Sequence, residues 1–479
     1  MDDAALLARL VAGLDHPNAT RRGQALLALI SSGELPPGQK LPPIRTVADQ
    51  LGMSPAAVGQ SWTLLRTRGI IETKTRGGTT VIGPPRSQRP QRFSQLNEVV
   101  EHTRVDLGRP LPDPRLLPDL GRALAEVGRR SHGLNLSDPP PITPQLREAL
   151  AGHWPFETDD VVAVHRGIDG VEHALTALVA KGDAVAVEDP TVPRVLDILD
   201  RIGARVIPIG WLDDGPDLRE LMRAFHSGAK LFVLQPNGHS PTGRSVSDAW
   251  LDEAAELVRR SEAHVIEFDN FPLLHPARKT LGVAVPEATV LIEGYSHSHG
   301  PDIQVAVMGG PREVIARVEQ QIAYSHRWVS RVLQDALAVL LASDEASATV
   351  RAAANEYQRR HAQARGWFIA RGFAVPEATS APSLWIPVVD DALVVERLAA
   401  RGIGVLPGQV FERRRAARRH VHVNGGLPFD EQLQYFAQIA DAADEVAEAL
   451  LADRRERYRA ENAAAGARAD GGADGGRAD

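Results

Sequence analysis

The sequence of 479 residues contains no cysteine, only five lysines and no long apolar run. The absence of cysteine excludes disulfide bonds, thiolate metal sites and cysteine nucleophiles, and it fits a reducing cytoplasm. The chain starts with an acidic Met1-Asp2-Asp3, and no long apolar segment follows, so we expect neither a secretory signal nor a membrane span. We therefore expect a cytoplasmic protein without a membrane partner.

Positive charge is not in excess over the chain as a whole. Asp and Glu number 61 against 54 Lys and Arg, which gives a net charge of −7 with neutral histidines. No global field therefore draws this protein to nucleic acid, and any DNA binding must come from a local basic patch. The chain is too long for a single core, so we expect two or three domains.

The first 82 residues carry the pattern of a small helical domain followed by a hairpin. Apolar periodicity predicts helices over 4–14, 21–32 and 42–51. Ser54 and Pro55 predict the start of a fourth helix, because serine caps a helix and proline suits its first turn. Two strand-like runs, 70–75 and 79–82, then flank a glycine-containing turn.

The fourth predicted helix has a buried face and an exposed face. Val58, Trp62 and Leu65 recur at i, i+4 and i+7, which predicts one inward stripe. Four residues of this helix are then expected to face outward: Ala56, Ala57, Gln60 and Ser61.

This order of elements is that of a winged helix-turn-helix, and its residues resemble the GntR family. The matches are the turn at 35–38, Leu41-Pro42, Arg45, Ala48, Leu51, Ser54, Val58, Leu65 and the Gly77-Gly78 wing. The resemblance implies double-stranded operator DNA as a partner, with the fourth helix in the major groove. The expected DNA-contacting residues are Arg45, Ser54, Ala56, Ala57, Gln60, Ser61, Arg66, Lys74, Arg76, Gly77 and Gly78.

These residues divide into two roles. Arg45, Arg66, Lys74 and Arg76 can neutralise phosphates. The family usually places an arginine directly after the capping serine, but Pro55 stands there, so a guanidinium able to read guanine is lost. Base reading must then come from the outward helix residues and the wing. A small helical domain for protein contacts is the alternative interpretation.

The rest of the chain alternates strand-like and helical patterns, which indicates an α/β fold. Strands that alternate with long amphipathic helices predict a doubly wound, mostly parallel sheet, with the site at the carboxyl ends of its strands. We expect a first domain over 1–82 (core 20–82), a linker over 83–100 and a second domain over 101–452. The second domain would have a large part over 101–340 and a smaller C-terminal α/β part over 341–452. The segment 453–479 is rich in Ala, Gly, Arg and Asp, and we expect it to be disordered.

Residues 293–304, which read Glu-Gly-Tyr-Ser-His-Ser-His-Gly-Pro-Asp-Ile-Gln, resemble the cofactor loop of fold-type I, pyridoxal-phosphate-dependent aminotransferases. With 107–113, 146–150 and 402–408, they resemble the aminotransferase-like domain of MocR-type regulators, which are GntR proteins fused to that fold. Anchored on Pro301, the family's lysine falls on His297 and its phosphate-binding arginine on Gln304. An imidazole cannot form the imine that a lysine amine forms with the cofactor. Two histidines in an ordinary polar loop are the alternative.

The same resemblance implies the other members of a ligand site. The aspartate that pairs with the pyridine nitrogen is Asp269, the cofactor-contacting asparagine is replaced by Ser240 with Asn237 nearby, and the carboxylate-clamping arginine falls on His422. The family's tyrosine falls near Phe271. A helix that cradles the phosphate on backbone N–H groups begins at Gly170. The expected ligand-site residues are Gly170, Asn237, Ser240, Asp269, Ser296, His297, Gln304 and His422. Asp269 as a turn carboxylate is the alternative.

The resulting expectation is a dimeric transcriptional regulator rather than an enzyme, with no catalytic residue, no bound cofactor and no metal. The resemblance implies a head-to-tail homodimer, and the second domain would sense an unknown small-molecule effector. The alternatives are a regulator that binds pyridoxal phosphate noncovalently, an aminotransferase with an added DNA-binding module, and a constitutive DNA-binding dimer.

Two further patterns are open to more than one interpretation. Histidines 239, 297, 299 and 422 could ligate zinc if they converged, but we expect them to serve as hydrogen-bond donors. The arginine-rich run at 413–419 is expected to be a solvated loop, with a second DNA-contacting patch as the alternative.

Overall fold

The computed structural model describes residues 26, 29, 30, 35, 38–67, 70–74, 78–82, 92, 94, 103–129, 140–275, 277–324, 327–377, 382–414 and 416–471. The chain divides into two compact units, Met1–Arg89 and Pro90–Asp479. The helix expected over 4–14, Arg76, Gly77 and nearly all of the linker lie outside the described residues. No helix within the described part of the chain is long and apolar enough to cross a membrane.

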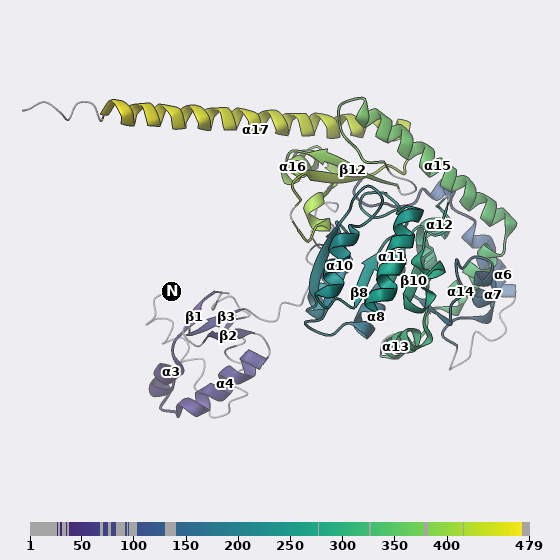
Figure 1. Cartoon of the computed structure of the whole chain (residues 1–479), viewed down its shortest axis with the longest axis horizontal. Helices are drawn as coiled ribbons and strands as arrows, with labels where there is room; N and C mark the ends of the chain where they lie inside the picture. The colour runs from purple at the N-terminus through teal and green to yellow at the C-terminus, as the bar shows by residue number, and fades with distance from the viewer. Residues whose placement is uncertain are drawn as a thin grey trace, which may run out of the picture. The chain divides into compact units, whose positions relative to one another are not determined.

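The first unit contains the predicted helix pair and wing (Figure 1). Helix α3 spans Ile44–Leu51 and ends at Gly52, whose left-handed φ of 64° suits glycine. Helix α4 spans Pro55–Thr67, and the Ser54 hydroxyl accepts a hydrogen bond from the Ala57 N–H at 3.2 Å, as expected of an N-cap. Three antiparallel strands form a sheet in the order β1-β3-β2: β1 Lys40–Leu41, β2 Ile71–Lys74 and β3 Gly78–Val81.

One apolar core holds the first unit together. The predicted stripe of Val58, Trp62 and Leu65 is at most 3% exposed and packs with Leu26 and Ile30 of the preceding segment. Strand β1 was not predicted, because two residues are too few to show a period. It extends the hairpin to three strands through the pairing of Leu41 with Thr79.

The second unit is built on a seven-stranded sheet in the order β5-β11-β10-β9-β8-β6-β7. Strand β11 is antiparallel to both neighbours and the other six run parallel, which confirms the predicted sheet. The strands are β5 Asp160–Val164, β6 Ala184–Asp189, β7 Arg205–Gly210, β8 Leu231–Leu234, β9 His264–Asp269, β10 Thr289–Gly294 and β11 Ala306–Gly310.

Helices cover both faces of this sheet (Figure 1). Side chains alternate along each strand, so that Val162 and Val164 pack with one helix layer and Val161 and Ala163 with the other. The first layer consists of α8 Gly167–Leu178, α9 Pro193–Ile202 and α13 Arg312–Ala323. The second consists of α6 Leu120–Arg129, α7 Pro144–Ala151, α10 Leu218–His226, α11 Asp248–Ser261 and α14 Arg331–Leu341.

A smaller subdomain follows the 26-residue helix α15, Asp344–Ile369. Its core lies under an antiparallel sheet in the order β12-β15-β14. Its elements are β12 Ser383–Val388, α16 Asp391–Ala400, β13 Ile403–Gly404, β14 Leu406–Pro407, β15 Arg419–Asn424 and the first part of α17.

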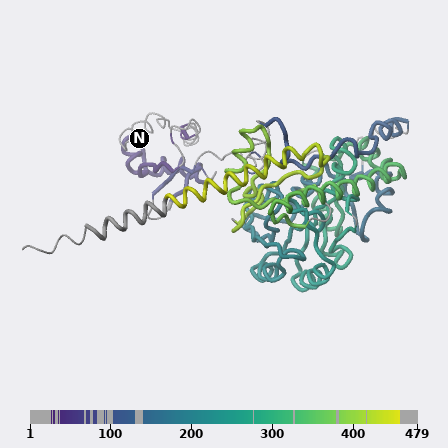
Figure 2. The backbone as a smooth tube through the Cα atoms, turned by 90° about the horizontal axis from the view of Figure 1, so that it is seen from above, coloured from purple at the N-terminus to yellow at the C-terminus, as the bar shows by residue number. Residues whose placement is uncertain are grey.

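The boundaries differ from the expectation at both ends of the second unit. Strand β4, Val105–Asp106, was assigned to the large part but pairs with β13 of the smaller subdomain, and Leu107 is buried in that subdomain's core. This long-range pairing leaves no local signal. The segment expected to be disordered from Asp453 is helical as far as Gly471, because it continues α17, Phe429–Gly471, through residues with high helix propensity (Figure 1). Figure 2 shows the preceding, yellow part of α17 extending away from the smaller subdomain.

Candidate functional site

The exposed face of α4 carries most of the residues predicted to read DNA. Ala56 and Gln60 are exposed and Ala57 is half-buried. Ser61 is 0% exposed, so the prediction that it faces outward is wrong. Position 61 lies three residues after Val58 and therefore within the buried stripe. Thr63, which was not predicted from the sequence, is exposed one turn after Gln60.

The basic residues of the first unit lie on several elements. Arg45 on α3 and Arg66 at the end of α4 are both exposed. Lys74 ends β2, and Gly78 begins β3 with a positive φ of 79°, which fits the wing turn. This arrangement places two exposed guanidinium groups on the two helices of the helix-turn-helix.

In the second unit, the predicted ligand-site residues come from loops at the carboxyl ends of adjacent strands. Asp269 ends β9 and is 2% exposed. Its Oδ1 accepts hydrogen bonds from the Phe271 N–H at 2.8 Å and from His275 Nε2 at 3.0 Å. Burial alone would raise the pKa of Asp269, but His275 and Arg278 outweigh it and hold that pKa below its usual value. Asp269 is therefore an ionised, buried carboxylate.

Asn237 is also buried at this edge, in the loop after β8. Its Oδ1 accepts from the Lys279 N–H and its Nδ2 donates to the Lys279 carbonyl, both at 2.8 Å. The same Nδ2 lies 3.5 Å from Asp269 Oδ2. Asn237 thus fixes the backbone of the loop that follows β9. Ser240 is half-buried, and its N–H donates to Gln235 Oε1 at 3.3 Å.

His297 lies in the short helix α12, Ser296–His299, which follows β10. Its Nε2 donates to the Pro110 carbonyl at 2.9 Å, and its ring packs on Phe271 with 4.6 Å between centroids. Burial lowers the pKa of His297, so the ring is neutral near pH 7. Gln304 adopts a left-handed φ of 47° and donates its amide to the Pro301 carbonyl at 2.8 Å.

Gly170, another position predicted for the ligand site, serves a backbone contact and packing. Helix α8 begins at Gly167, three residues earlier than predicted, so the Gly170 N–H donates to the Arg166 carbonyl at 2.9 Å and is not available to an anion. A Cβ at Gly170 would lie 2.9 Å from Ile292 Cγ2, so this glycine lets α8 approach β10.

His422 on β15 is 1% exposed and belongs to the smaller subdomain. Its Nδ1 donates to the Gly108 carbonyl at 3.0 Å, and its Nε2 accepts from the Ser383 hydroxyl at 3.1 Å. Burial lowers the pKa of His422 to about 4. A neutral His422 provides no positive charge for a carboxylate.

The three lysines of the second unit, Lys181, Lys230 and Lys279, do not direct their ammonium groups to the predicted ligand-site residues. Lys279 pairs with Asp248 at the start of α11, and Lys230 Nζ donates to the Ser261 carbonyl at 3.3 Å. Lys181 is exposed in the turn after α8.

The four histidines considered as zinc ligands each bond to a different group. His239 Nε2 donates to the Pro190 carbonyl at 2.9 Å, and His299 Nδ1 lies 2.9 Å from Ser298 Oγ. Within the described ranges, no group of three or more His, Asp or Glu side chains could hold a metal ion.

The arginine-rich run at 413–419 is paired with acidic groups. Arg413 pairs with Asp200 on α9 at 3.1 Å, and Arg414 pairs with Glu220 on α10 at 2.9 Å. Both backbone N–H groups donate to Asp189, at 2.8 and 2.9 Å. These arginines join the smaller subdomain to the large one, a role that the sequence analysis did not predict.

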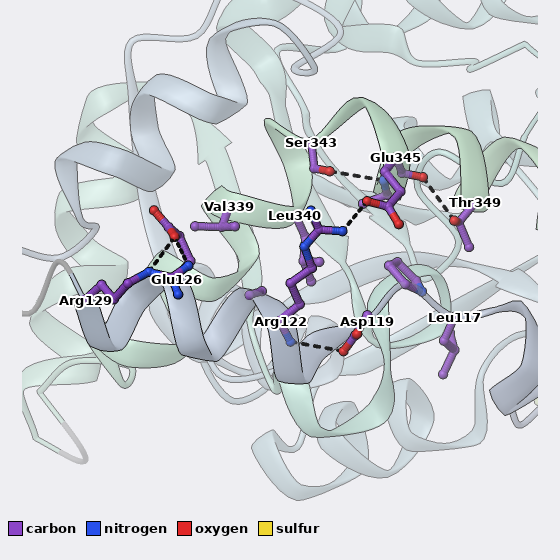
Figure 3. A pocket seen from close by; sticks show the side chains of 13 residues that line it. Leu117, Asp119, Arg122, Glu126, Arg129, Val339, Leu340, Ser343, Glu345 and Thr349 are labelled. Atoms are coloured by element: carbon purple, nitrogen blue, oxygen red, sulfur yellow. Dashed lines mark hydrogen bonds and ion pairs between the residues drawn. The ribbon is translucent and has the colours of Figure 1, made fainter.

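A hollow of about 480 Å³ lies away from these residues, between residues 117–119, α6 and the junction of α14 with α15 (Figure 3). Its apolar floor includes Leu117, Val339 and Leu340, and charged pairs such as Arg122 with Glu345 line its rim. None of the eight residues predicted for the ligand site lines it.

These contacts do not fit a covalently bound pyridoxal phosphate. Where the resemblance places a lysine and an arginine, His297 and Gln304 each bond to a backbone carbonyl of the chain. Asp269 keeps the residue type that the resemblance implies for its cofactor contact, whereas His297, Gln304, Ser240 and His422 do not.

Comparison with protein families accounts for both units. Residues 111–424 match the family described as aminotransferase class I and II, and residues 19–81 match the bacterial regulatory proteins of the gntR family. The chain belongs to the aminotransferase class I and II family. Its fusion to a gntR-type winged helix-turn-helix is the organisation of MocR-type transcriptional regulators, which confirms the predicted family and fold class.

This MocR-type chain is similar to curated regulators. It is 29% identical over 365 residues to the vitamin B6 salvage pathway transcriptional repressor PtsJ of Salmonella typhimurium, covering 75% of this chain and 80% of the relative. It is 23% identical over 346 residues to the HTH-type pyridoxine biosynthesis transcriptional regulator PdxR of Corynebacterium glutamicum, covering 68% and 73%. The solved structure of Pyrococcus horikoshii kynurenine aminotransferase has a TM-score of 0.68 at 17% identity, covering 74% of this chain and 94% of its own, and shows the fold alone.

Proposed function

We propose that this MocR-type regulator binds operator DNA as a homodimer and senses a small molecule in its second unit without a covalent cofactor. The observation that carries the proposal is the use of His297, Gln304 and His422 to hold the chain's own backbone or a neighbouring hydroxyl. Side chains committed in this way are poorly suited to transamination, which needs an amine and fixed positive charges at those places. Head-to-tail dimerisation is part of the proposal because the family resemblance implies it.

The DNA-binding part can be tested with salt-dependent gel shifts on promoter DNA. Arg45→Ala and Arg66→Ala should each weaken binding to all sequences and reduce the slope of log K against log salt by about one, because each would remove a phosphate contact. Gln60→Ala should change sequence preference instead. Ser61→Ala should do neither, since Ser61 is buried.

Arg259→Ala, an exposed change on α11 of the second unit, is the matched control and should leave binding unchanged. If both the full protein and residues 1–82 ignore promoter DNA at low salt, the proposal of DNA binding fails.

Noncovalent binding of pyridoxal phosphate is the second candidate. Asp269 favours it, because an ionised carboxylate can pair with a protonated pyridine nitrogen. The names of PtsJ and PdxR, which place those relatives in vitamin B6 salvage and pyridoxine biosynthesis, also support it.

Borohydride reduction separates covalent from noncovalent binding. We expect purified protein to be colourless and, after addition of pyridoxal phosphate and borohydride, to carry no pyridoxyl group in the second unit. His297→Lys should restore little, because binding groups act together and Gln304 still provides no charge. Asp269→Asn is the companion variant: loss of a spectral change on titration would support noncovalent binding through that carboxylate. A pyridoxyl group mapped by mass spectrometry to Lys279 would contradict the proposal.

A further inference from the structure

Residues 107–113, here called the strap, cross from the smaller subdomain to the large one. Leu107 begins in the smaller subdomain, where its N–H donates to the Gly404 carbonyl at 2.8 Å and its carbonyl accepts from the Asn424 N–H at 2.7 Å. Three residues later, the Pro110 carbonyl accepts from His297 of the large subdomain at 2.9 Å. The strap is therefore bonded to both subdomains within four residues.

Three consecutive carbonyls of the strap accept hydrogen bonds from side chains. His422 donates to Gly108, the Asn424 amide donates to Arg109 at 3.1 Å, and His297 donates to Pro110. Burial lowers the pKa of both histidines, so both rings are neutral: His422 donates its N–H to the Gly108 carbonyl, and His297 lies within hydrogen-bonding distance of the backbones of Pro110 and Asn270. The positions that the resemblance assigns to the lysine and to the carboxylate-binding arginine are therefore those that hold the strap.

The strap's own sequence explains why side chains must hold it. Pro110 and Pro112 have no N–H, and with Pro114 they keep the segment stiff and extended. Because two of its seven residues lack an N–H, the strap cannot pair with a neighbouring strand along its whole length. At Gly108 a Cβ would lie 2.8 Å from Leu406 Cγ, so only glycine allows this close approach to β14.

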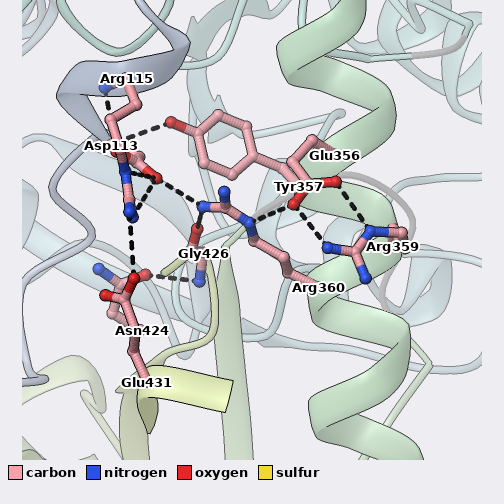
Figure 4. Close-up of polar contacts among 9 residues, drawn as sticks. All are labelled: Asp113, Arg115, Glu356, Tyr357, Arg359, Arg360, Asn424, Gly426 and Glu431. Carbon is pink, nitrogen blue, oxygen red and sulfur yellow. Dashed lines mark hydrogen bonds and ion pairs between the residues drawn. The ribbon is translucent and has the colours of Figure 1, made fainter. Parts of the chain in front are cut away.

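A buried charge fixes the far end of the strap (Figure 4). Asp113 is 1% exposed, its N–H donates to the Tyr357 hydroxyl at 2.9 Å, and its Oδ2 accepts from Arg360 at 2.8 Å. Arg360 on α15 also donates to the Gly426 carbonyl at 2.8 Å. His297 and His422 each contact the strap through one hydrogen bond between neutral groups. These hydrogen bonds are weaker than the ion pair of Asp113 with Arg360, so the strap is held less firmly at Gly108 and Pro110 than at Asp113.

We propose that the strap is the conformational switch of this regulator: seated on His297 and His422 it holds the two subdomains together, and an effector acts by displacing it. This inference rests on the proposed function, because it states how binding of a small molecule to the second unit would change the structure of the regulator. The strap continues β4, the strand through which the chain enters the smaller subdomain after the linker, so the proposed switch lies at the start of the second unit.

Hydrogen exchange of the full-length protein, followed by mass spectrometry, tests the attachment. Leu107, Gly108, Arg109, Leu111 and Asp113 all have hydrogen-bonded N–H groups when the strap is seated. In the variant carrying His297→Ala and His422→Ala, these amides should exchange roughly tenfold faster or more, because one buried and one half-buried hydrogen bond to the strap are lost. The variant carrying His297→Gln and His422→Asn, which keeps side-chain N–H donors, should recover part of the protection.

Two further variants separate strap release from general destabilisation. His226→Ala also removes a histidine within 2.8 Å of a backbone carbonyl, that of Met222, but it lies on α10 and should leave strap exchange unchanged. Gly108→Ala should raise strap exchange without altering either histidine, because the added Cβ would meet Leu406. It provides the test if the double alanine variant does not fold.

The affinity for operator DNA tests whether release of the strap regulates DNA binding. Strap-released variants should change the Kd for promoter DNA about fivefold or more relative to His226→Ala, the range expected for coupled sites. Unchanged strap exchange in both released variants, or faster exchange with an unchanged Kd, would overturn the inference. If wild-type protein does not bind promoter DNA, the proposed function fails, and the exchange measurement still decides whether the histidines hold the strap.

Discussion

Arg360→Met is expected to lower the free energy of unfolding by about 3 kcal/mol, the lower end of the range for breaking a buried ion pair. Arg360 is 6% exposed and donates to Asp113, to Glu356 and to the Gly426 carbonyl. Burial would raise the pKa of Asp113, yet hydrogen bonds from Arg115 and Arg360 lower it to about 2. Methionine leaves that buried carboxylate with the exposed Arg115 alone, and it leaves the Gly426 carbonyl without this donor.

The neighbouring residue provides a matched control. Arg359 also pairs with Glu356, but its side chain is 56% exposed and the pair is screened by solvent, so Arg359→Met should lower the free energy of unfolding far less than Arg360→Met does. Denaturant unfolding of both variants against wild type measures the difference. Equal losses of stability would show that the buried position of the Arg360 pair has no special weight.

The protein is expected to lose stability steeply on acidification from pH 6.5 towards pH 4.5. Burial lowers the pKa of His239 to about 3 and the pKa values of His299, His361, His420 and His422 to about 4. In the unfolded chain these groups return to about 6.5, so unfolding takes up protons between the two values. The free energy of unfolding therefore falls as the pH falls through this window.

Two buried carboxyl groups oppose this effect. Burial raises the pKa of Glu267 to about 7 and the pKa of Glu188 well above its usual value, so each releases a proton on unfolding. Among these groups, five histidines gain and two carboxyl groups lose a proton, which leaves a net uptake of about three near pH 5. At about 1.4 kcal/mol per proton and pH unit, the free energy of unfolding changes by about 4 kcal/mol per pH unit.

Denaturant unfolding at pH 7, 6 and 5 checks this expectation. His361→Gln should reduce the slope by about one proton, since His361 is buried against the Ser383 carbonyl. The exposed His226→Ala should leave the slope as it is. Stability that stays level from pH 7 to pH 5 would contradict the expected effect.

The first unit shows how far local patterns determine a fold. The spacing of Val58, Trp62 and Leu65 predicted the buried face of α4, and Ser54 was confirmed as its cap. Ser61 was assigned to the wrong face because a polar residue on an apolar stripe cannot be recognised from its type. Its position three residues after Val58 contained the needed signal.

The second unit shows what local patterns leave out. Its parallel sheet was predicted from alternating elements, but the pairing of β4 with β13 joins residues some 300 positions apart and leaves no periodic trace. The partner of Asp269 was likewise missed, because His275 lies in an irregular loop. Positions at strand ends could be predicted from the family resemblance, whereas their hydrogen-bond partners required the three-dimensional arrangement.

Helix α17 carries a consequence for the end of the chain. Residues such as Phe436, Ile439 and Val446 are buried in the smaller subdomain, but residues 451–456 are all exposed. The buried part of α17 serves as the nucleus for the exposed part beyond the core. The exposed part can therefore unwind and rewind one residue at a time from its free end, without a separate nucleation step. Its opening free energy therefore falls gradually towards Gly471, and its last turns can be lost without cooperative unfolding of the subdomain.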